Sequence, residues 1–401
     1  MESKYYKKDA WWTSPFNEKE EVREASLPKK PIELHDATLR DGEQTPGVVF
    51  TAKEKLEIAE KLVEAGVTRI EAGMPAVSES DAQAIREIAK TFSEANIFAF
   101  VRATEGDIDM AADCGAKGVI IEVPIGYPKL QYQFHWTWEK VFEKSAKCIN
   151  YAKERGLKAV YFPYDATRAR EEDIENLFGA LMRDAAPDAI GIVDTMGCAL
   201  PQTIAYMVRW YKSLTNGLPI EVHCHNDFGM AVASELAGAA AGADVLHGCV
   251  NGLGERTGNA AIEELIMALN ILMGLETPYQ VDRLMPLCQT VERLSGVRCA
   301  LNKPFMGERN YTRESGIGVD LVMKEPLAMF ATDPRYFGRK ADVVLGKKSG
   351  KLSIRYYLEQ MQIDATEEQV AQMLACVKEQ GIAKKRLLTN EEFLAIVKEC
   401  M

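Results

Sequence analysis

Histidine is scarce in this chain of 401 residues, and no histidine occurs after residue 247. The full set is His35, His135, His223, His225 and His247. The C-terminal part therefore offers no imidazole for acid–base catalysis or for binding a metal. Two members of the set, His223 and His225, stand two residues apart.

Three other shortages exclude classes of protein. The nine cysteines are scattered and never spaced as CxxC, which argues against a zinc ribbon or a disulfide framework and suits the reducing cytoplasm. No apolar run approaches the roughly 18 residues of a membrane-spanning helix, and residues 1–12 lack the apolar core of a secretory signal. Lys and Arg total 48 against 59 Asp and Glu, and the net charge of −11 opposes binding to nucleic acid or anionic membranes.

Between residues 31 and 272, β-rich runs alternate with amphipathic helical patterns. The eight runs are 32–39, 68–72, 96–101, 118–123, 158–162, 189–193, 219–222 and 244–250. Helical periodicity is clear at 51–65, 78–92, 137–155 and 202–214, and Gly66, Gly115, Gly156 and Gly242 follow helical runs as left-handed caps would. The pattern predicts an α/β protein, a (β/α)₈ TIM barrel, with an open doubly wound sheet as the alternative.

The rhythm changes outside this region, so we expect three parts. Residues 1–30 predict an N-terminal extension, residues 31–275 the barrel, and residues 276–401 a smaller, mainly helical region. Two glycine-containing segments, 251–259 and 345–352, resemble nucleotide-binding loops but miss the required spacing, so neither predicts a nucleotide site.

The most informative local motif is EVHCHND, at the end of the seventh predicted strand. Because strand side chains alternate, His223 and His225 face the same side and can bind one divalent metal. The first predicted strand leads into ATLRDGEQTPG, which supplies Arg40, Asp41 and Glu43. A carboxylate with two imidazoles suits Mg²⁺, Mn²⁺, Co²⁺ or Zn²⁺ acting as a Lewis acid, and Arg40 can stabilise a developing enolate or alkoxide.

Other polar residues follow strands whose carboxyl ends share one rim of a barrel, where barrel enzymes build their active sites. They are Arg102, Asp165, Arg168, Asp194, Thr195 and the segment 251–259. Singly, such residues are often helix caps or turn residues. Together they predict a site for a small, oxygen-rich, anionic substrate.

These motifs resemble the DRE-TIM metallolyases, in particular the branch of homocitrate, isopropylmalate and citramalate synthases. The matching segments are 35–47, 71–79, 193–197, 221–233, 251–264 and 345–351. The resemblance implies that Asp41, His223, His225 and Asn259 bind a divalent metal, that Arg40 polarises a 2-oxo group, and that Thr195 binds the carboxylate of a 2-oxo acid. Arg102 and Arg168 are further substrate-binding candidates on the same rim, and Glu43 is a further catalytic candidate.

The reaction implied is condensation of acetyl-CoA with a 2-oxo acid, followed by hydrolysis of the thioester. The resemblance also implies a homodimer in which the region after the barrel reaches the partner's active site. The chain ends too early for the regulatory domain of leucine-inhibited relatives, so we expect none.

Two departures limit the transfer. Where the synthases usually read FTHKAGIH, this chain reads YTRESGIG, with Arg313 and Gly318 in place of the two histidines, so the general base becomes Tyr311, Glu314 or a group from elsewhere. After the fourth strand, the arginine that homocitrate synthases direct at a distal carboxylate is missing, and Lys129 and aromatic residues stand there. A neutral or bulkier 2-oxo acid is therefore as compatible with the sequence as 2-oxoglutarate.

Three functions remain open on these residues. The first is an acyltransferase of the homocitrate/isopropylmalate synthase type. The second is a metal-dependent carbon–carbon lyase or aldolase, which the missing histidines favour. The third is a non-catalytic metal-binding barrel, which the intact set of Arg40, Asp41, His223, His225 and Asn259 disfavours.

Overall fold

The computed structural model describes residues 4–401 and divides them into two compact units. One unit is Glu18–Cys299, and the other joins the described residues up to Asn17 with Ala300–Met401. The first three residues of the expected N-terminal extension lie outside the described part. No helix in residues 4–401 is long and apolar enough to cross a membrane.

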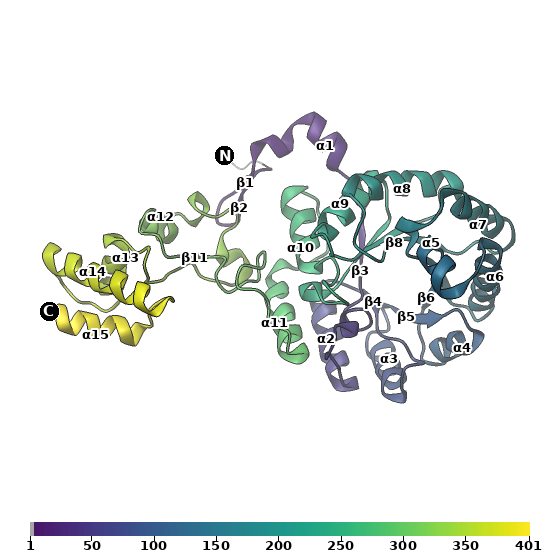
Figure 1. The fold of residues 1–401 in the computed structure, drawn as a ribbon, viewed down its shortest axis with the longest axis horizontal. Helices are drawn as coiled ribbons and strands as arrows, with labels where there is room; N and C mark the ends of the chain where they lie inside the picture. The colour runs from purple at the N-terminus through teal and green to yellow at the C-terminus, as the bar shows by residue number, and fades with distance from the viewer. Residues whose placement is uncertain (1–3) are drawn as a thin grey trace. The chain divides into compact units, whose positions relative to one another are not determined.

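The larger unit is a closed barrel of parallel strands with helices around it (Figure 1). Its strands are β3 (Glu33–Asp36), β4 (Arg69–Glu71), β5 (Asn96–Arg102), β6 (Gly118–Pro124), β7 (Lys158–Tyr164), β8 (Ala189–Asp194), β9 (Ile220–Cys224) and β10 (Val245–Gly248), with β10 pairing with β3 to close the ring. The helices between and after them are α2 (Ala52–Glu64), α3 (Glu79–Thr91), α4 (Glu105–Asp113), α5 (Tyr127–Lys129), α6 (Trp138–Glu154), α7 (Glu171–Asp184), α8 (Pro201–Leu214), α9 (Ala231–Ala241), α10 (Ile262–Met267) and α11 (Leu284–Ser295), and α1 (Glu20–Ser26) precedes the barrel. The predicted TIM barrel is confirmed.

Local sequence signals explain where the helices begin and end. Thr51 caps α2 by accepting from the amide of Glu54, whose carboxylate in turn accepts from the amide of Thr51. Ser78 and Thr104 cap α3 and α4 in the same way through their side-chain oxygens. The four predicted cap glycines all have the positive φ angles that only glycine adopts without strain, from 75° to 107°.

Three of the eight predicted strands, 32–39, 68–72 and 244–250, are longer than the observed strands, and the two larger differences fall at the mouth of the barrel. β3 ends at Asp36, after which the chain folds into a tight turn that contains Arg40 and Asp41. β10 ends at Gly248, and the chain continues into a 3₁₀ turn with Asn251 at φ 60°. Residues 37–39 and 249–250 are apolar or small, as in a strand, but they form the loops of the candidate site.

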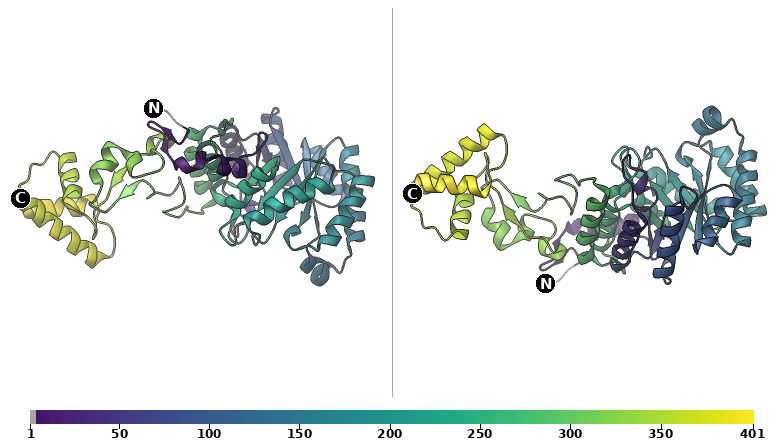
Figure 2. Two further views of the ribbon diagram at one scale, coloured as in Figure 1. Left: turned by 90° about the horizontal axis from the view of Figure 1, so that it is seen from above. Right: turned by 90° about the horizontal axis from the view of Figure 1, so that it is seen from below.

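The smaller unit contains two short strand pairs and four helices of the predicted helical region. Its elements are β1 (Tyr6–Lys7), β2 (Trp11–Trp12), β11 (Thr312–Arg313), β12 (Asp342–Val343), α12 (Val319–Lys324), α13 (Lys351–Gln360), α14 (Glu367–Lys384) and α15 (Asn390–Cys400), which Figure 2 shows from two further sides. The amide of Trp12 donates to the carbonyl of Ala331 at 2.8 Å, so the N-terminal segment is part of this unit. The last three helices enclose an apolar cluster around Ile354, Val377 and Phe393.

Candidate functional site

Asp41, His223 and His225 meet at the carboxyl end of the barrel. One atom from each side chain lies within 4.8 Å of the others. His223 Nε2 is 3.1 Å from Asp41 Oδ2, and His225 Nε2 is 3.6 Å from the same oxygen. All three side chains are buried. Burial would raise the pKa of Asp41, but Arg40 and the two histidines outweigh it and hold this pKa well below its ordinary value.

Asn259 is brought beside this group by the glycine-rich loop after β10. It forms a β-bridge with His225, and its Nδ2 donates to the carbonyl of Leu253 at 3.0 Å. Gly254 has φ 145°, and a Cβ there would overlap Asn259 Nδ2. Glycine at this position therefore leaves room for the asparagine amide.

The residues present fit a divalent cation. Asp41 Oδ1 and Asn259 Oδ1 are buried without a hydrogen-bond partner, which is costly for polar atoms unless something else pairs with them. Two oxygens and two imidazoles form a mixed donor set of the kind that binds Mg²⁺, Mn²⁺, Co²⁺ or Zn²⁺. The structure thus brings together the four residues predicted as metal ligands.

Arg40 is held next to this group by Glu71, at the end of β4. Arg40 Nε donates to Glu71 Oε1 at 2.7 Å, and its guanidinium lies 4.2 Å from the ring centre of Phe100. Burial would raise the pKa of Glu71, but Arg40 and His35 outweigh it and lower the pKa to about 2. Glu71 therefore stays ionised, and it fixes both the charge and the direction of Arg40.

A second group of potential ligands lies deeper in the barrel, formed by His35, Glu71 and His247. The two imidazole rings stack with centroids 4.2 Å apart, and burial lowers the pKa of both histidines. His247 Nε2 donates to Glu221 at 2.8 Å, and Glu221 accepts from Arg69 at 2.6 Å. Glu71 is already paired with Arg40, and Glu221 with Arg69. This network therefore holds Glu71, and through it Arg40, in position.

A cavity of about 340 Å³ opens above the candidate metal ligands. Its lining includes Arg40, Asp41, Thr195, His223 and His225, all predicted as site residues, together with Gln44, Met74, Phe100, Glu122, Pro124, Lys129, Gln133, Phe134, Tyr164, Val193 and Glu255. Thr195 Oγ1 accepts from the amide of Asp165 at 2.9 Å, which fixes its side chain at the wall. The volume suits a small organic acid.

Glu122 is an acidic residue of the cavity wall that the sequence motifs do not predict. It is a lone acidic residue in the apolar run GVIIEVP, two positions after Ile120, which packs in the barrel interior. Strand alternation therefore places it on the inner face, and this break in an otherwise apolar strand was the available signal. Burial raises the pKa of Glu122 to about 7, although Arg40 opposes the rise.

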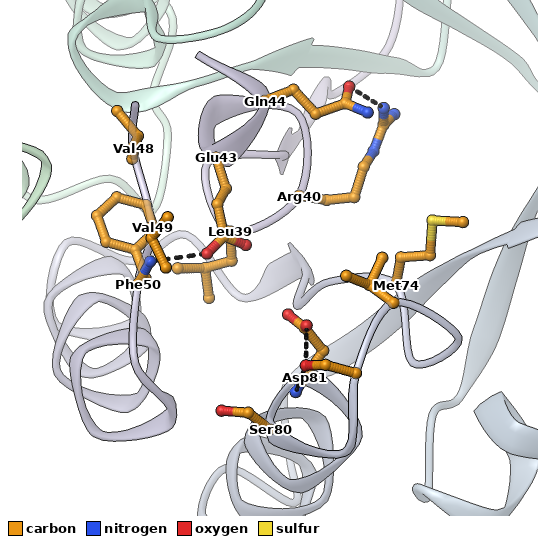
Figure 3. A pocket seen from close by; sticks show the side chains of 12 residues that line it. Leu39, Arg40, Glu43, Gln44, Val48, Val49, Phe50, Met74, Ser80 and Asp81 are labelled. Atoms are coloured by element: carbon orange, nitrogen blue, oxygen red, sulfur yellow. Dashed lines mark hydrogen bonds between the residues drawn. The ribbon is translucent and has the colours of Figure 1, made fainter. Parts of the chain in front are cut away.

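Glu43 does not line the cavity that holds Asp41 and the two histidines. Figure 3 shows the side chains of Glu43 and Arg40 leaving the same turn in opposite directions. Glu43 accepts from the amide of Phe50 at 2.7 Å and forms an ion pair with the buried Lys55 at 2.6 Å. These contacts give Glu43 a role in fixing the turn. Glu43 lines a neighbouring pocket, to which Arg40, Leu39 and Asp81 also contribute.

Arg102 and Arg168 are on the predicted rim but are not among the residues that line the cavity. Arg102 binds Asp107 through Nε at 2.8 Å and through Nη2 at 3.0 Å. Arg168 makes the equivalent pair of bonds to Asp165, at 2.8 and 2.7 Å. Both guanidinium groups are engaged at helix starts, so neither is free for a substrate in this conformation.

Tyr311 lies in the smaller unit, where it is 5% exposed and its hydroxyl is hydrogen-bonded to Thr332 at 2.8 Å. Burial raises its pKa, which makes the phenol a poor base. In the same segment, Arg313 donates twice to the carbonyl of Ile317, and Gly318 has φ 80°. Of the two positions where the synthases carry histidine, Arg313 is engaged in hydrogen bonds within its own loop and Gly318 adopts a left-handed backbone conformation.

These features define a (β/α)₈ barrel with a candidate divalent-metal centre at the carboxyl ends of its strands. Residues 31–291 match the HMGL-like family, and residues 305–385 match the family described as homocitrate synthase post-HMGL domain-like. The chain belongs to the HMGL-like family and to its branch of homocitrate, citramalate and isopropylmalate synthases.

Individual relatives support this placement. Homocitrate synthase AksA of Methanocaldococcus jannaschii is 40% identical over 96% of this chain and 93% of its own length. The (R)-citramalate synthase CimA of the same organism is 38% identical over 92% of this chain and 74% of its own length. Among solved structures, the hydroxymethylglutaryl-CoA lyase from Pseudomonas aeruginosa superposes with a TM-score of 0.60 at 19% identity, covering 68% of this chain and 96% of that one, which supports the fold alone.

Proposed function

We propose that the protein is a metal-dependent acyltransferase that condenses acetyl-CoA with a 2-oxo acid to give a 2-hydroxy di- or tricarboxylic acid. The observation that carries the proposal is the cluster of Asp41, His223 and His225 beside Arg40 in one cavity. The names of the relatives, which include homocitrate and citramalate synthases, support the same class of reaction.

Each residue of the site has a part in this reaction. Asp41, His223, His225 and Asn259 would hold the divalent metal, which supplies Lewis acidity to the carbonyl of the 2-oxo acid when bound. Arg40 donates hydrogen bonds to the oxygen on which negative charge develops. Thr195, at the cavity wall, offers its hydroxyl to the substrate carboxylate.

The test is release of free CoA by the purified protein with Mg²⁺ or Mn²⁺. The acceptor panel is pyruvate, 2-oxoisovalerate and 2-oxoglutarate. We expect CoA release above the rate of acetyl-CoA hydrolysis with at least one acceptor. No release with any of the three, in protein shown to bind Mn²⁺, would overturn the proposal.

A carbon–carbon lyase or aldolase on the same site is the second candidate. It is favoured by Arg313 and Gly318, which replace the histidines of the synthases and are engaged in a local loop. A lyase would cleave a 2-hydroxy or 4-hydroxy acid without acetyl-CoA. The same four residues would hold the metal, which would supply Lewis acidity, and Arg40 would donate to the oxygen on which charge develops. Product formation from these acids, together with silence in the CoA assay, would favour it.

We also propose that the protein is a homodimer, in keeping with the resemblance to the synthases. Light scattering of the purified full chain would give twice the monomer mass of 44.6 kDa. A monomer under assay conditions would contradict this.

A further inference from the structure

Condensation needs a base that removes a proton from the acetyl methyl group, and the segment around Tyr311 does not present one. Tyr311 is buried with its hydroxyl bonded to Thr332, and Glu314 accepts from the amide of Lys348 at 3.0 Å. Arg313 stays protonated near neutral pH. We therefore expect the base to be another group, and the titratable side chains of the cavity are the candidates.

Eight titratable side chains line the cavity, and most are committed to other tasks. They are Arg40, Asp41, Glu122, Lys129, Tyr164, His223, His225 and Glu255. Asp41 and the two histidines are the candidate metal ligands, while Arg40 and Lys129 are cations. Burial raises the pKa of Tyr164 to about 12, which disfavours its phenolate. Glu255 has a side chain that is 57% exposed and lies 3.7 Å from Arg256.

Glu122 differs from every other carboxylate at this level of the barrel. Asp41 contacts His223, and Glu71 contacts Arg40 and His35. Within the described residues, Glu122 has no hydrogen bond and no ion pair, although it is half-buried at the cavity wall. Because no neighbouring side chain binds this carboxylate and it faces the cavity, it is available to a ligand.

The position of Glu122 is also fixed by its surroundings. It comes from β6, where it pairs in register with Phe162 of β7 and follows Ile120 on the inner face. It is outside the group whose ligand atoms lie within 4.8 Å of one another, so it is not a further member of the metal cluster. Glu122 lines the same cavity as Arg40 and Asp41, which places its carboxylate in the space that the substrate would occupy.

We propose that Glu122 is the general base of the condensation, taking the place of the histidines that this chain lacks. The proposal rests on the proposed function. The carboxylate takes one proton from the acetyl methyl group, the C–H electron pair becomes the C=C bond of the enolate, and the electron pair of the thioester carbonyl moves to its oxygen. The enolate carbon then bonds to the carbonyl carbon of the 2-oxo acid, and the carbonyl electron pair moves to the oxygen beside Arg40. The alkoxide takes the proton from Glu122 and becomes the 2-hydroxyl group, which restores the carboxylate of Glu122. Water then adds to the thioester carbonyl carbon and the C–S bond breaks. The sulfur leaves as free CoA with one proton of the water, and the new carboxylic acid releases the other proton to solvent.

The test compares Glu122→Gln and Glu122→Asp with the parent and with the matched control Glu64→Gln, at an exposed carboxylate of α2 that pairs with Lys61 outside the cavity. Glutamine keeps the size and hydrogen bonding of Glu122 but cannot accept the proton. We expect Glu122→Gln to lower kcat for CoA release by about 10²- to 10⁴-fold. The KM for the 2-oxo acid and the binding of Mn²⁺ should stay within threefold. Glu122→Asp should be faster than Glu122→Gln, and Glu64→Gln should stay near the parent.

A second measurement follows the proton itself. In D₂O, mass spectrometry of the remaining acetyl-CoA reports exchange of the methyl hydrogens. We expect exchange in the parent with a 2-oxo acid bound and its loss in Glu122→Gln. Retained exchange, or a kcat within threefold of the parent, would overturn the role of Glu122 while leaving the proposed function intact. A parent that releases no CoA with any acceptor overturns the proposed function, and this inference with it.

Discussion

Arg40 and Glu71 form a buried ion pair, with Nε and Oε1 2.7 Å apart, that joins the turn after β3 to the end of β4. The side chain of Arg40 is only 8% exposed, and that of Glu71 is fully buried. A charge held this way is ready before substrate binds, so little reorganisation is needed when negative charge develops beside it.

Glu71→Gln should therefore lower activity without removing the metal ligands. We expect kcat to fall by about 10- to 100-fold, as for other residues that orient a reacting group, with Mn²⁺ affinity within threefold. Steady-state CoA release and Mn²⁺ titration measure the two effects.

The matched control is Glu43→Gln, which removes a carboxylate from the same turn but from the pocket around Lys55. Because Lys55 keeps Asp81 as a partner at 2.6 Å, the control should keep kcat within threefold. A loss of kcat in Glu43→Gln as large as in Glu71→Gln would contradict our interpretation and favour the catalytic role predicted from sequence.

Asp41→Ala should abolish stable metal binding, since it removes the oxygen that both imidazoles face. We expect the Mn²⁺ dissociation constant to rise at least about 100-fold, because even outer residues of such sites contribute 10- to 100-fold. Elemental analysis and Mn²⁺ titration measure it, with Gln44→Ala, on the same cavity wall, as the control. Equal bound metal in Asp41→Ala and the parent would refute the assignment of the centre.

The sequence predicted the barrel, and it predicted that Arg40 and Asp41 lie with His223 and His225, because both features follow local rules. The spacing of His223 and His225 on a strand, and of Arg40 and Asp41 after another strand, places four side chains at one rim once the barrel is known. The sequence did not predict Glu122 as a site residue, because a single acidic residue in an apolar strand can equally face solvent. Only closure of the barrel shows which face of β6 points inward.

The same limit explains the rim residues that did not join the cavity. Arg102 and Arg168 follow strands as predicted, but each finds an aspartate within five positions, at Asp107 and Asp165. A short, charge-assisted contact of this kind outcompetes a distant site. Tyr311 lies in a separate compact unit, and its burial there depends on packing against Phe330 and Phe337 that no local motif signals.

Gly254→Ala should weaken metal binding through Asn259. A methyl group at position 254 would overlap Asn259 Nδ2, so the amide must move away from its present place. We expect a loss of Mn²⁺ affinity of about 10-fold or more. The control is Gly47→Ala, which has φ 89° but no atom within 4 Å of the added Cβ, and so tests backbone strain alone. Equal Mn²⁺ affinities for the two variants would argue against Asn259 as a ligand.

Asp107 should make the stability of the barrel unit depend on pH. Burial would raise its pKa, but Arg102 and Thr104 outweigh it, and the pKa is lower than in an unfolded chain. The stabilisation is therefore complete above the unfolded pKa of about 3.9 and is lost as the pH falls through the folded value. Asp107→Asn should be less stable than the parent by about 1–2 kcal/mol at pH 7, and the gap should narrow below pH 4.

Urea unfolding of both proteins at pH 7, 4.5 and 3.5 measures this gap. Asp113→Asn, at an exposed carboxylate that ends the same helix, is the control and should differ little from the parent at each pH. A gap between Asp107→Asn and the parent that stays constant from pH 7 to 3.5 would contradict the assigned ion pair.

Lys129 should favour 2-oxo acids that carry a second acidic group. It lines the cavity from α5, bonds to Gln133 at 3.1 Å and lies 5.3 Å from the ring centre of Tyr164, and within the described residues it has no ion pair. Arg40, the other cation of the lining, is already paired with Glu71. We expect Lys129→Met to raise the KM for 2-oxoglutarate by about 10-fold or more, in line with the loss of a hydrogen bond to a charged group, and to leave the KM for pyruvate within threefold. Lys140→Met, at a lysine that pairs with Glu143 on α6, is the control. An equal change in KM for both acids would show that Lys129 does not bind the distal carboxylate of 2-oxoglutarate. The neutral 2-oxo acids would then be the better substrate candidates.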